Sequence, residues 1–273
     1  MPAHPTALRF SRLLLTGAAG ALGGMLRPRL KAYCEVLRLS DRAPLGEAAP
    51  GEELQVADLT APGAAEAMVA GVDAIVHLGG ISVEDEWERI LASNIDGLVR
   101  LYEAARRARV RRIVFASSNH ATGFYRQDEV IDARALPRPD TYYGLSKAFG
   151  ENLAQLYWDR FGLETVSLRI GSCTPAPTDR RMLATWLSHD DLERLVVAAL
   201  TAPVVGHTIV FGCSDNTTTF WDNRLARHLG WRPQDSSEPW RAEIEARQGP
   251  VDPRDPASRY QGGRFVRLGP FPE

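Results

Sequence analysis

The sequence predicts an α/β fold in which helices cover both faces of a doubly wound parallel β-sheet. Three observations support this fold class. Short apolar runs alternate with helical patterns through the first two thirds of the 273 residues, which is typical of right-handed βαβ crossovers. These runs carry Leu, Val and Ile on both faces, as strands buried on either side require. A glycine-rich turn joins the first run to the first helix.

The predicted elements follow one another in a regular order. Strands are expected at Arg12–Thr16, Glu35–Leu39, Leu54–Ala57, Ala74–Leu78, Arg112–Ser117 and Thr165–Ile170. Helices are expected at about Ala21–Tyr33, Pro62–Val69, Glu86–Ala108 and Thr141–Phe161. Pro28 falls inside the first of these helices, where we expect a kink because proline removes a helical hydrogen bond.

Beyond about Ser172 the character of the chain changes, because prolines become frequent and strands become fewer. We expect residues 1–171 to form the sheet domain and residues 172–273 to form a smaller substrate-binding portion interleaved with it. This C-terminal portion should contain a helix at Asp190–Thr201 and a strand at Thr208–Cys213.

Composition and charge are those of a globular protein and argue against several classes of partner. Hydrophobic residues make up 44% of the chain and charged residues 24%, and the length suffices to bury a full core. The net charge of −2 gives no electrostatic reason to expect nucleic acid or an anionic membrane. The cysteines lack CxxC spacing, which argues against a disulfide framework or a zinc site and favours a cytoplasmic protein. They are Cys34, Cys173 and Cys213.

The apolar run from Leu13 to Leu26 needs its own argument, because Arg9 and Arg12 precede it as in a signal peptide. The run contains four glycines and leads into basic residues instead of a small-residue cleavage site. It is also too short to span a bilayer. We therefore expect it to form the first strand and turn of the fold, with no membrane segment.

The glycine-rich turn has the spacing of a dinucleotide-binding site. Gly17, Gly20 and Gly23 lie where the first strand ends and the first helix begins. Glycines at this spacing let the backbone turn tightly, approach a pyrophosphate closely and pack the helix against the sheet. The helix N-terminus then offers N–H groups and a positive dipole to the phosphates. Residues 1–171 are therefore predicted to form a dinucleotide-binding domain of the Rossmann type.

Two carboxylates at strand ends bear on the identity of the dinucleotide. Asp41 follows the second strand, where it can accept hydrogen bonds from the adenosine ribose and would repel a 2′-phosphate. This favours NAD over NADP, although Arg42 could instead bind a 2′-phosphate. Asp58, at the end of the third strand, is placed to contact the adenine amine.

Tyr143 and Lys147 are the predicted catalytic pair. They stand four residues apart at the start of a helical pattern, so both side chains can point into one cleft. A nearby ammonium stabilises phenolate, and we expect it to lower the pKa of Tyr143 toward the range of a general base. Ser118, at the end of the fifth strand, is the candidate to polarise the reacting hydroxyl or carbonyl, although a serine there commonly caps a turn.

Two further polar residues have both a functional and a structural interpretation. The fourth strand ends in the run HLGG at 77–80, where small residues would let the cofactor pass closely. His77 is more often structural than a ligand in such a place. Asn94 shares the apolar stripe of its helix and should be buried and hydrogen-bonded. The sequence is compatible with two roles for Asn94: a relay through water to Lys147, or a core amide whose hydrogen bonds are all made within the protein.

These features together resemble the extended short-chain dehydrogenase/reductase superfamily, and several strings resemble the uronate dehydrogenase family within it. The strings are HLGGISVE at 77–84, FASSNH at 115–120, RIGSCTP at 169–175, RMLATWLSHDD at 181–191 and QGG-x-F at 261–265. The resemblance extends from about Thr16 to Phe265. It implies oxidation of the C1 hydroxyl of galacturonate or glucuronate to an aldarolactone, with hydride passing to NAD and Tyr143 as the base.

The resemblance also implies a substrate site and a set of cofactor contacts. Arg181 would bind the substrate carboxylate bidentately, which a lysine could not do with the same geometry. The residues expected to contact substrate hydroxyls or wall the pocket are Ser82, Ser118, Asn119, His120, Ser172 and Phe265. The residues expected to contact NAD are Gly17, Gly20, Ala21, Leu22, Gly23, Asp41, Asp58, Leu59, His77, Leu78, Gly79, Gly80, Asn94, Tyr143, Lys147 and Cys173.

Two rival functions use the same fold. A sugar-nucleotide epimerase or dehydratase would use the same Tyr and Lys, but such enzymes usually carry a longer C-terminal portion than the roughly one hundred residues after Ser172. A non-catalytic NAD-binding sensor would be expected to lose part of the set Ser118, Tyr143 and Lys147, all of which are present. Fold alone does not separate these functions. Whether the protein forms a homo-oligomer is also left open.

Overall fold

The structure is a computed structural model that describes residues 10–269, so Arg9 lies outside the described residues. Its main element is a seven-stranded sheet in the order β10-β7-β5-β4-β1-β2-β3, with every neighbouring pair parallel. The strands are β1 (Phe10–Thr16), β2 (Cys34–Asp41), β3 (Glu52–Val56), β4 (Ala74–His77), β5 (Arg112–Ser118), β7 (Glu164–Ile170) and β10 (His207–Gly212). The predicted doubly wound parallel sheet is confirmed.

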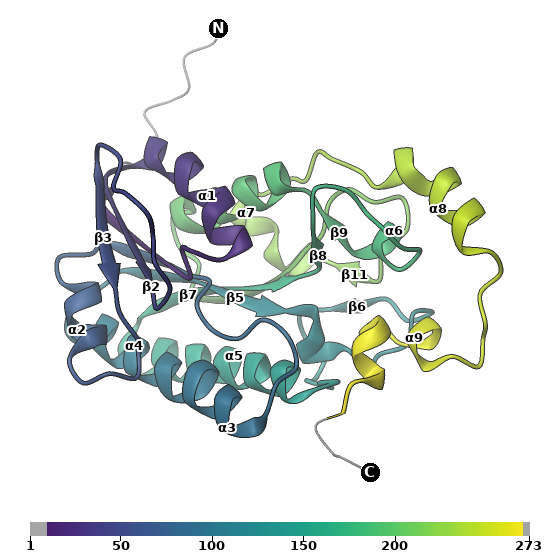
Figure 1. Cartoon of the computed structure of the whole chain (residues 1–273), viewed down its shortest axis with the longest axis horizontal. Coiled ribbons are helices and arrows are strands. Elements are labelled where there is room, and N and C mark those ends of the chain that lie inside the picture. The colour runs from purple at the N-terminus through teal and green to yellow at the C-terminus, as the bar shows by residue number, and fades with distance from the viewer. Residues whose placement is uncertain (1–9, 270–273) are drawn as a thin grey trace, which may run out of the picture.

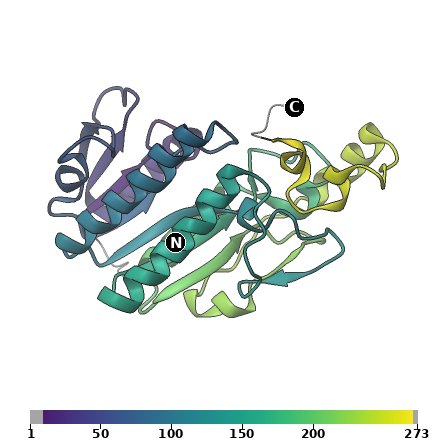
Figure 2. The same cartoon turned by 90° about the horizontal axis from the view of Figure 1, so that it is seen from below.

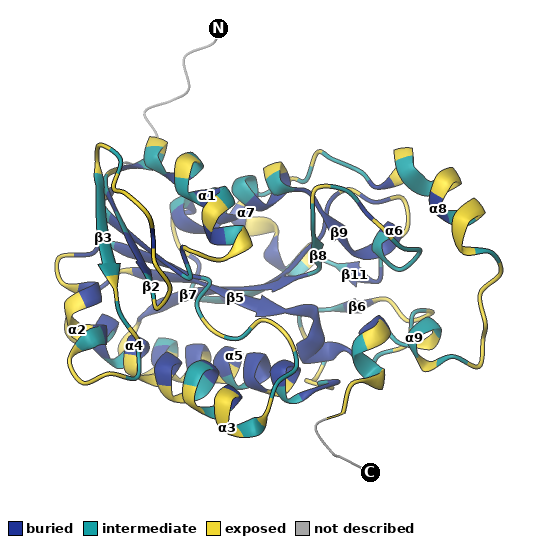
Figure 3. Cartoon of the chain, in the orientation of Figure 1, coloured by how far each residue is buried: buried dark blue, intermediate teal, exposed yellow. Residues whose placement is uncertain are grey.

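Helices form a layer on each face of this sheet (Figures 1 and 2). One layer contains α1 (Ala21–Leu30) and α7 (His189–Thr201), and the other contains α2 (Ala64–Val69), α4 (Gly97–Arg107) and α5 (Tyr142–Phe161). The central strands between the layers are largely buried and the edge strand β3 is half-buried, whereas the outer sides of the helices are exposed (Figure 3). This burial explains why the strands are apolar on both faces.

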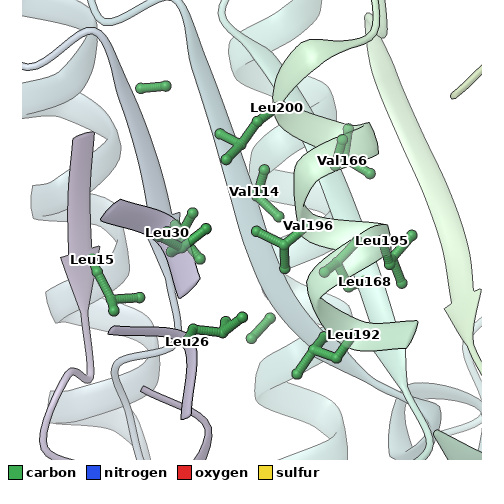
Figure 4. Packing of buried hydrophobic residues seen from close by; sticks show 14 of the residues in the cluster. Leu15, Leu26, Leu30, Val114, Val166, Leu168, Leu192, Leu195, Val196 and Leu200 are labelled. Atoms are coloured by element: carbon green, nitrogen blue, oxygen red, sulfur yellow. The ribbon is translucent and has the colours of Figure 1, made fainter. Parts of the chain in front are cut away.

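The packing of α7 shows how the sequence pattern builds the core. Its apolar residues recur at helical spacing, and Leu192, Leu195 and Val196 are fully buried against the sheet (Figure 4). They pack in the same cluster as Val166 and Leu168 of β7. Full burial of such a side chain contributes roughly 1.5–3 kcal/mol. The first turn of α7 is capped by the hydroxyl of Ser188, which accepts a hydrogen bond from the backbone N–H of Asp191.

The structure differs from the predicted helices in two places. The single helix expected between residues 86 and 108 consists of α3 (Trp87–Ile90), a π-helical segment (Leu91–Asp96) and α4. A π-helical turn keeps a helical apolar stripe, so the sequence pattern does not distinguish it from an α-helix. The first helix continues through Pro28 and ends at Leu30, after which a 3₁₀ turn follows.

Short elements gather beyond the carboxyl ends of β5 and β7 (Figure 1). They include the paired strands β6 (Ile131–Asp132) with β11 (Trp221–Asp222), and β8 (Ser172–Cys173) with β9 (Trp186–Leu187). They also include the helices α6 (Met182–Thr185), α8 (Arg241–Gln248) and α9 (Pro256–Arg259), and a 3₁₀ segment at Gly263–Arg267. None of these was predicted. In the part of the chain from 10 to 269, no helix is long and apolar enough to cross a membrane.

Candidate active site

A cleft of about 1650 Å³ lies along the carboxyl ends of the strands, where doubly wound sheets bind their ligands. Its walls include predicted cofactor contacts, namely Gly17, Gly20, Ala21, Leu22, Gly23, Asp41, Asp58, Leu59, Leu78, Gly79, Gly80 and Cys173. They also include the predicted catalytic and substrate residues Ser82, Ser118, Asn119, His120, Tyr143, Lys147, Ser172, Arg181 and Phe265. The fold therefore brings these distant segments to one cavity.

The glycine-rich turn fits the phosphates of a dinucleotide. Gly17 has a φ of +69°, and a Cβ at this position would overlap the backbone of Leu78 and Gly79. A Cβ at Gly23 would overlap the carbonyl oxygen of Gly17. Only glycines let the turn pack this closely against β4 and α1. Because α1 has no side-chain cap and no acidic residue in its first turn, its N–H groups and positive dipole are available to an anion in the cleft.

Two carboxylates border the adenosine end of the predicted cofactor site. Asp41, the last residue of β2, accepts hydrogen bonds from the backbone N–H groups of Ala19 (3.0 Å) and Ala43 (2.9 Å). These bonds hold Asp41 beside the glycine-rich turn. Asp58 accepts from the backbone N–H and the hydroxyl of Thr60, and the backbone bond lowers the pKa of this carboxyl below its usual value. Both groups therefore present hydrogen-bond acceptors to the cleft.

His77 and Asn94 are the two predicted contacts that do not line the cleft. The Nδ1 atom of His77 lies 2.6 Å from the hydroxyl of Thr16, and burial lowers the pKa of this imidazole to about 3. Asn94 donates to the carbonyl of Ile81 and to the hydroxyl of Ser146, and it accepts from the N–H of Ile81. Their hydrogen bonds lie within the protein, which favours the structural role for both and does not support a direct contact with a cofactor.

The N-terminus of α5 sets the position of Tyr143 and Lys147. The hydroxyl of Thr141 caps the helix by accepting from the N–H of Gly144 (3.0 Å). The carboxylate of Glu84 reaches over from the loop after β4 and accepts from the N–H groups of Tyr142 (3.2 Å) and Tyr143 (2.9 Å). The Nζ atom of Lys147 then lies 5.6 Å from the centre of the Tyr143 ring.

The pKa of Tyr143 differs in direction from the sequence-based expectation. Burial raises it to about 12, and the hydrogen bond with Ser118 lowers it by less than burial raises it. Burial also lowers the pKa of Lys147 to about 8, because the ammonium loses its hydration. The expectation that Lys147 lowers the pKa of Tyr143 is therefore wrong: desolvation raises this pKa, and the only opposing contact is the hydrogen bond with Ser118.

Arg181 is a half-buried cation on the wall of the cleft. No ion pair involves it within residues 10–269, and burial lowers its pKa to about 10. Its Nε atom donates to the carbonyl of Gln261, Nη1 lies 3.3 Å from the hydroxyl of Ser172, and Nη2 lies 2.8 Å from the amide oxygen of Asn119 in the orientation that satisfies that amide. The neighbouring Arg180 instead contacts carbonyls of the α8 region. Arg181 therefore has a positive charge to offer to a ligand.

His120 and Phe265 form an aromatic wall beside Tyr143. The two rings stack with centres 3.8 Å apart and planes inclined by 23°, and the His120 ring lies 5.9 Å from that of Tyr143. Nδ1 of His120 is 2.7 Å from the carboxylate of Asp140. This wall stands next to the phenol and completes the part of the cleft where Arg181 lies.

Sequence reasoning missed three residues that hold the site together. Asp140 and Glu84 are ordinary loop carboxylates in the sequence, and only the fold shows that one binds His120 and the other caps α5. Gln261 is fully buried and joins the C-terminal segment to the loop before β6 through the carbonyls of Arg126 and Glu129. The available signals were the place of Gln261 in the string QGG-x-F and the place of Glu84 at the end of the string HLGGISVE.

Comparison with known proteins relates this chain to dehydrogenases. Residues 13–189 match the NAD dependent epimerase/dehydratase family. The chain is 58% identical to a uronate dehydrogenase of Pseudomonas putida over 97% of this chain and 99% of that protein, and 53% identical to one of Agrobacterium fabrum over 93% and 96%. It is also similar to a mutant uronate dehydrogenase of Agrobacterium tumefaciens crystallised with NAD, with a TM-score of 0.93, 52% identity and coverage of 96% and 99%. The chain therefore belongs to the uronate dehydrogenases of the NAD dependent epimerase/dehydratase family.

Proposed function

We propose that this protein is an NAD-dependent dehydrogenase that oxidises the C1 hydroxyl of a hexuronate, galacturonate or glucuronate, to the aldarolactone. The observation that carries the proposal is Arg181, a half-buried guanidinium on the cleft wall without an ion-pair partner among residues 10–269. A cation that has lost part of its hydration is costly unless an anion compensates it. The carboxylate of a uronic acid is an anion of suitable shape, because a guanidinium can bind it through two parallel hydrogen bonds.

The substrate is oriented by groups around Arg181. With its carboxylate on the guanidinium, the sugar ring extends toward Tyr143 along a wall of hydrogen-bonding side chains. Ser172 and Asn119 already contact Arg181, so they lie where the hydroxyls next to the carboxylate would bind. Ser82 and His120 line the same cleft. Phe265 closes one side and excludes water from the reacting carbon.

In the chemical step, the proton of the C1 hydroxyl passes to the phenolate oxygen of Tyr143 as the C1–H bond breaks. When bound, NAD would supply the acceptor for the hydride and a positive charge that favours the phenolate. Ser118 hydrogen-bonds the C1 oxygen while the carbonyl of the lactone forms. Lys147 lies 5.6 Å from the tyrosine ring, and its pKa near 8 allows proton exchange close to neutral pH.

The cofactor contacts follow the residues of the cleft. The N-terminus of α1 and the glycine-rich turn would hold the pyrophosphate. Asp41 would accept hydrogen bonds from the adenosine ribose, and Asp58 would contact the adenine. Arg42 also lines the cleft. The preference for NAD over NADP therefore depends on whether Asp41 hydrogen-bonds the adenosine ribose or Arg42 binds a 2′-phosphate on it.

The proposal places the enzyme in the cytoplasm, which is supported by three cysteines that all carry free thiols.

The rival function, epimerisation of a sugar nucleotide, would leave NAD unreduced over the whole cycle. One spectrophotometric assay separates the two functions: NAD reduction with galacturonate, glucuronate, galactose and a UDP-hexose tested side by side. We expect reduction with the two uronates and little with the neutral sugar. Reduction with neither uronate would exclude the proposed function.

A further inference from the structure

His120 and Asp140 form a buried pair at the edge of the cleft, and Asp140 has no part in the steps above. Nδ1 of His120 lies 2.7 Å from Oδ2 of Asp140, and both residues are less than a tenth exposed. Asp140 does not line the cleft, whereas His120 does. Any influence of this carboxylate on the substrate must therefore act through the imidazole.

Three glycines from distant parts of the chain enclose the carboxylate of Asp140. A Cβ added at Gly123 or at Gly262 would overlap Oδ2, and one added at Gly144 would lie 3.1 Å from Oδ1. These positions belong to the loop after β5, the C-terminal segment and the first turn of α5. A side chain at Gly123 or Gly262 would therefore displace this carboxylate.

The hydrogen bonds of this pair determine which nitrogen of His120 carries the proton. Oδ1 of Asp140 accepts from the hydroxyl of Thr141 (3.1 Å), which leaves Oδ2 to accept from the imidazole. Nδ1 therefore carries a hydrogen. Burial lowers the pKa of His120 below its ordinary value, although the hydrogen bond and charge of Asp140 act in the opposite direction. The ring is therefore neutral near pH 7, and Nε2 keeps its lone pair.

Nε2 of His120 is the nitrogen left for a ligand. It forms no hydrogen bond with any described residue. It is also not among the completely buried polar atoms of those residues that lack a partner, so it is open to the cleft. Phe265 stacks on the face of the His120 ring, with the two ring centres 3.8 Å apart, and so fixes the plane of the imidazole. A fixed acceptor thus stands in a cleft wall where Arg181 offers only donors.

We propose that Asp140 is a positioning residue: it holds His120 as the Nδ1–H tautomer, so that Nε2 accepts a hydrogen bond from a secondary hydroxyl of the sugar. The proposal rests on the proposed function for the identity of the sugar, but the tautomer itself does not. It also explains the two adjacent glycines of the C-terminal segment. Gly262 makes room for Asp140, and Gly263, with a φ of +61°, makes room for Arg181.

The direct test is Asp140→Asn, which conserves the shape of the side chain. Because the hydroxyl of Thr141 donates to one side of this group, the amide oxygen should face Thr141 and the amide nitrogen should face His120. The variant would then donate to Nδ1 and move the proton to Nε2. Nitrogen-15 NMR of histidine-labelled protein distinguishes the tautomers, and the signal of His120 among the six histidines is the one lost in His120→Ala.

Kinetics supply the second readout. We expect Asp140→Asn to lower kcat/KM for the preferred uronate about 2- to 10-fold, the effect of one altered hydrogen bond. In a His120→Ala background the same substitution should have almost no further effect, because Asp140 acts through the imidazole. Asp128→Asn, at an exposed carboxylate paired with Arg126, is the matched control and should leave both readouts unchanged. Gly262→Ala, which crowds Oδ2, should reproduce the loss if Asp140→Asn does not fold.

Three results would overturn the proposal: an unprotonated Nδ1 in the unmutated protein, an unchanged tautomer in Asp140→Asn, or equal kinetic losses with and without His120. A protein that fails to reduce NAD with any uronate would contradict the proposed function instead, and the NMR result would still decide the tautomer.

Discussion

At the scale of single residues, the site is defined by charges that the protein leaves without a charged partner. Arg181 is half-buried on the cleft wall, whereas Arg180, next to it, contacts Glu245 and the carbonyls near α8. The difference between these two neighbours is not visible in the sequence. It arises because Gly263 leaves space for the Arg181 side chain to turn toward Asn119 and Ser172.

The Arg181 side chain can be tested by removing its charge. We expect Arg181→Ala to lower kcat/KM for a uronate at least ~10-fold, because a hydrogen bond to a charged group contributes about 1.5–3 kcal/mol. Arg181→Lys should restore only part of this loss, since an ammonium cannot form two parallel bonds. The neutral hexoses, which lack the carboxylate, should be poor substrates before and after the change. A purely structural arginine would depress acid and neutral sugars equally.

Tyr143 can be tested in the same way. Tyr143→Phe keeps the ring in its packed position and removes only the hydroxyl, so turnover should fall roughly 10²- to 10⁴-fold, the usual loss for an acid–base group. Tyr142→Phe, the same substitution on the preceding residue, is the control and should change turnover little. NAD reduction under saturating uronate gives kcat, and circular dichroism checks the fold. Near-normal turnover in a folded Tyr143→Phe protein would exclude the phenol as the base.

At the scale of elements, the first turn of α5 is the part that determines where the catalytic pair lies. Glu84 reaches this turn from the loop after β4, the same loop that carries Ser82 to the cleft. One carboxylate thus joins a substrate loop to the catalytic helix. A negative charge at this end is also favoured by the helix dipole.

We expect Glu84→Gln to destabilise the protein by about 1 kcal/mol, because the helix loses a charged acceptor at its N-terminus. For a chain of this size the loss corresponds to a fall in Tm of about 2–4 °C. The same change should lower kcat/KM for uronate, since both the helix and the loop lose their common anchor. The control is Glu86→Gln, at an exposed carboxylate of the same loop. Equal Tm values for the two variants would contradict the role of Glu84.

At the scale of the whole molecule, the fold was predictable because each strand and helix carries its own pattern. Apolar runs and the turn at Gly17 are local properties of the chain, and they were enough to predict the parallel sheet and a dinucleotide site where its first strand ends. The pKa of Tyr143 was not predictable, because it depends on burial by segments far away in the sequence. Asp140 was missed for the same reason: its contacts with Gly123 and Gly262 exist only after folding.

The core of the molecule also contains a titratable group whose burial links stability to pH. The pKa of His77 is lowered to about 3 in the folded protein, below its ordinary value of 6.5, because burial between β1 and β5 disfavours the imidazolium. Between these pH values the unfolded chain binds a proton that the folded chain does not. The stability from His77 is therefore complete above about pH 6.5 and decreases as the pH falls toward 3.

We expect the free energy of unfolding to decrease by up to about 1.4 kcal/mol per pH unit below pH 6.5 from this group alone. Other groups add to the total slope, so the measurement is a comparison of urea unfolding from pH 7.5 to 4.5 in the unmutated protein and in His77→Gln. His77→Gln should weaken the hydrogen bond with Thr16, so we expect the variant to be less stable than the unmutated protein at pH 7.5. Its free energy of unfolding should, however, decrease less steeply as the pH falls. Parallel slopes for His77→Gln and the unmutated protein would show that the buried imidazole does not govern this dependence.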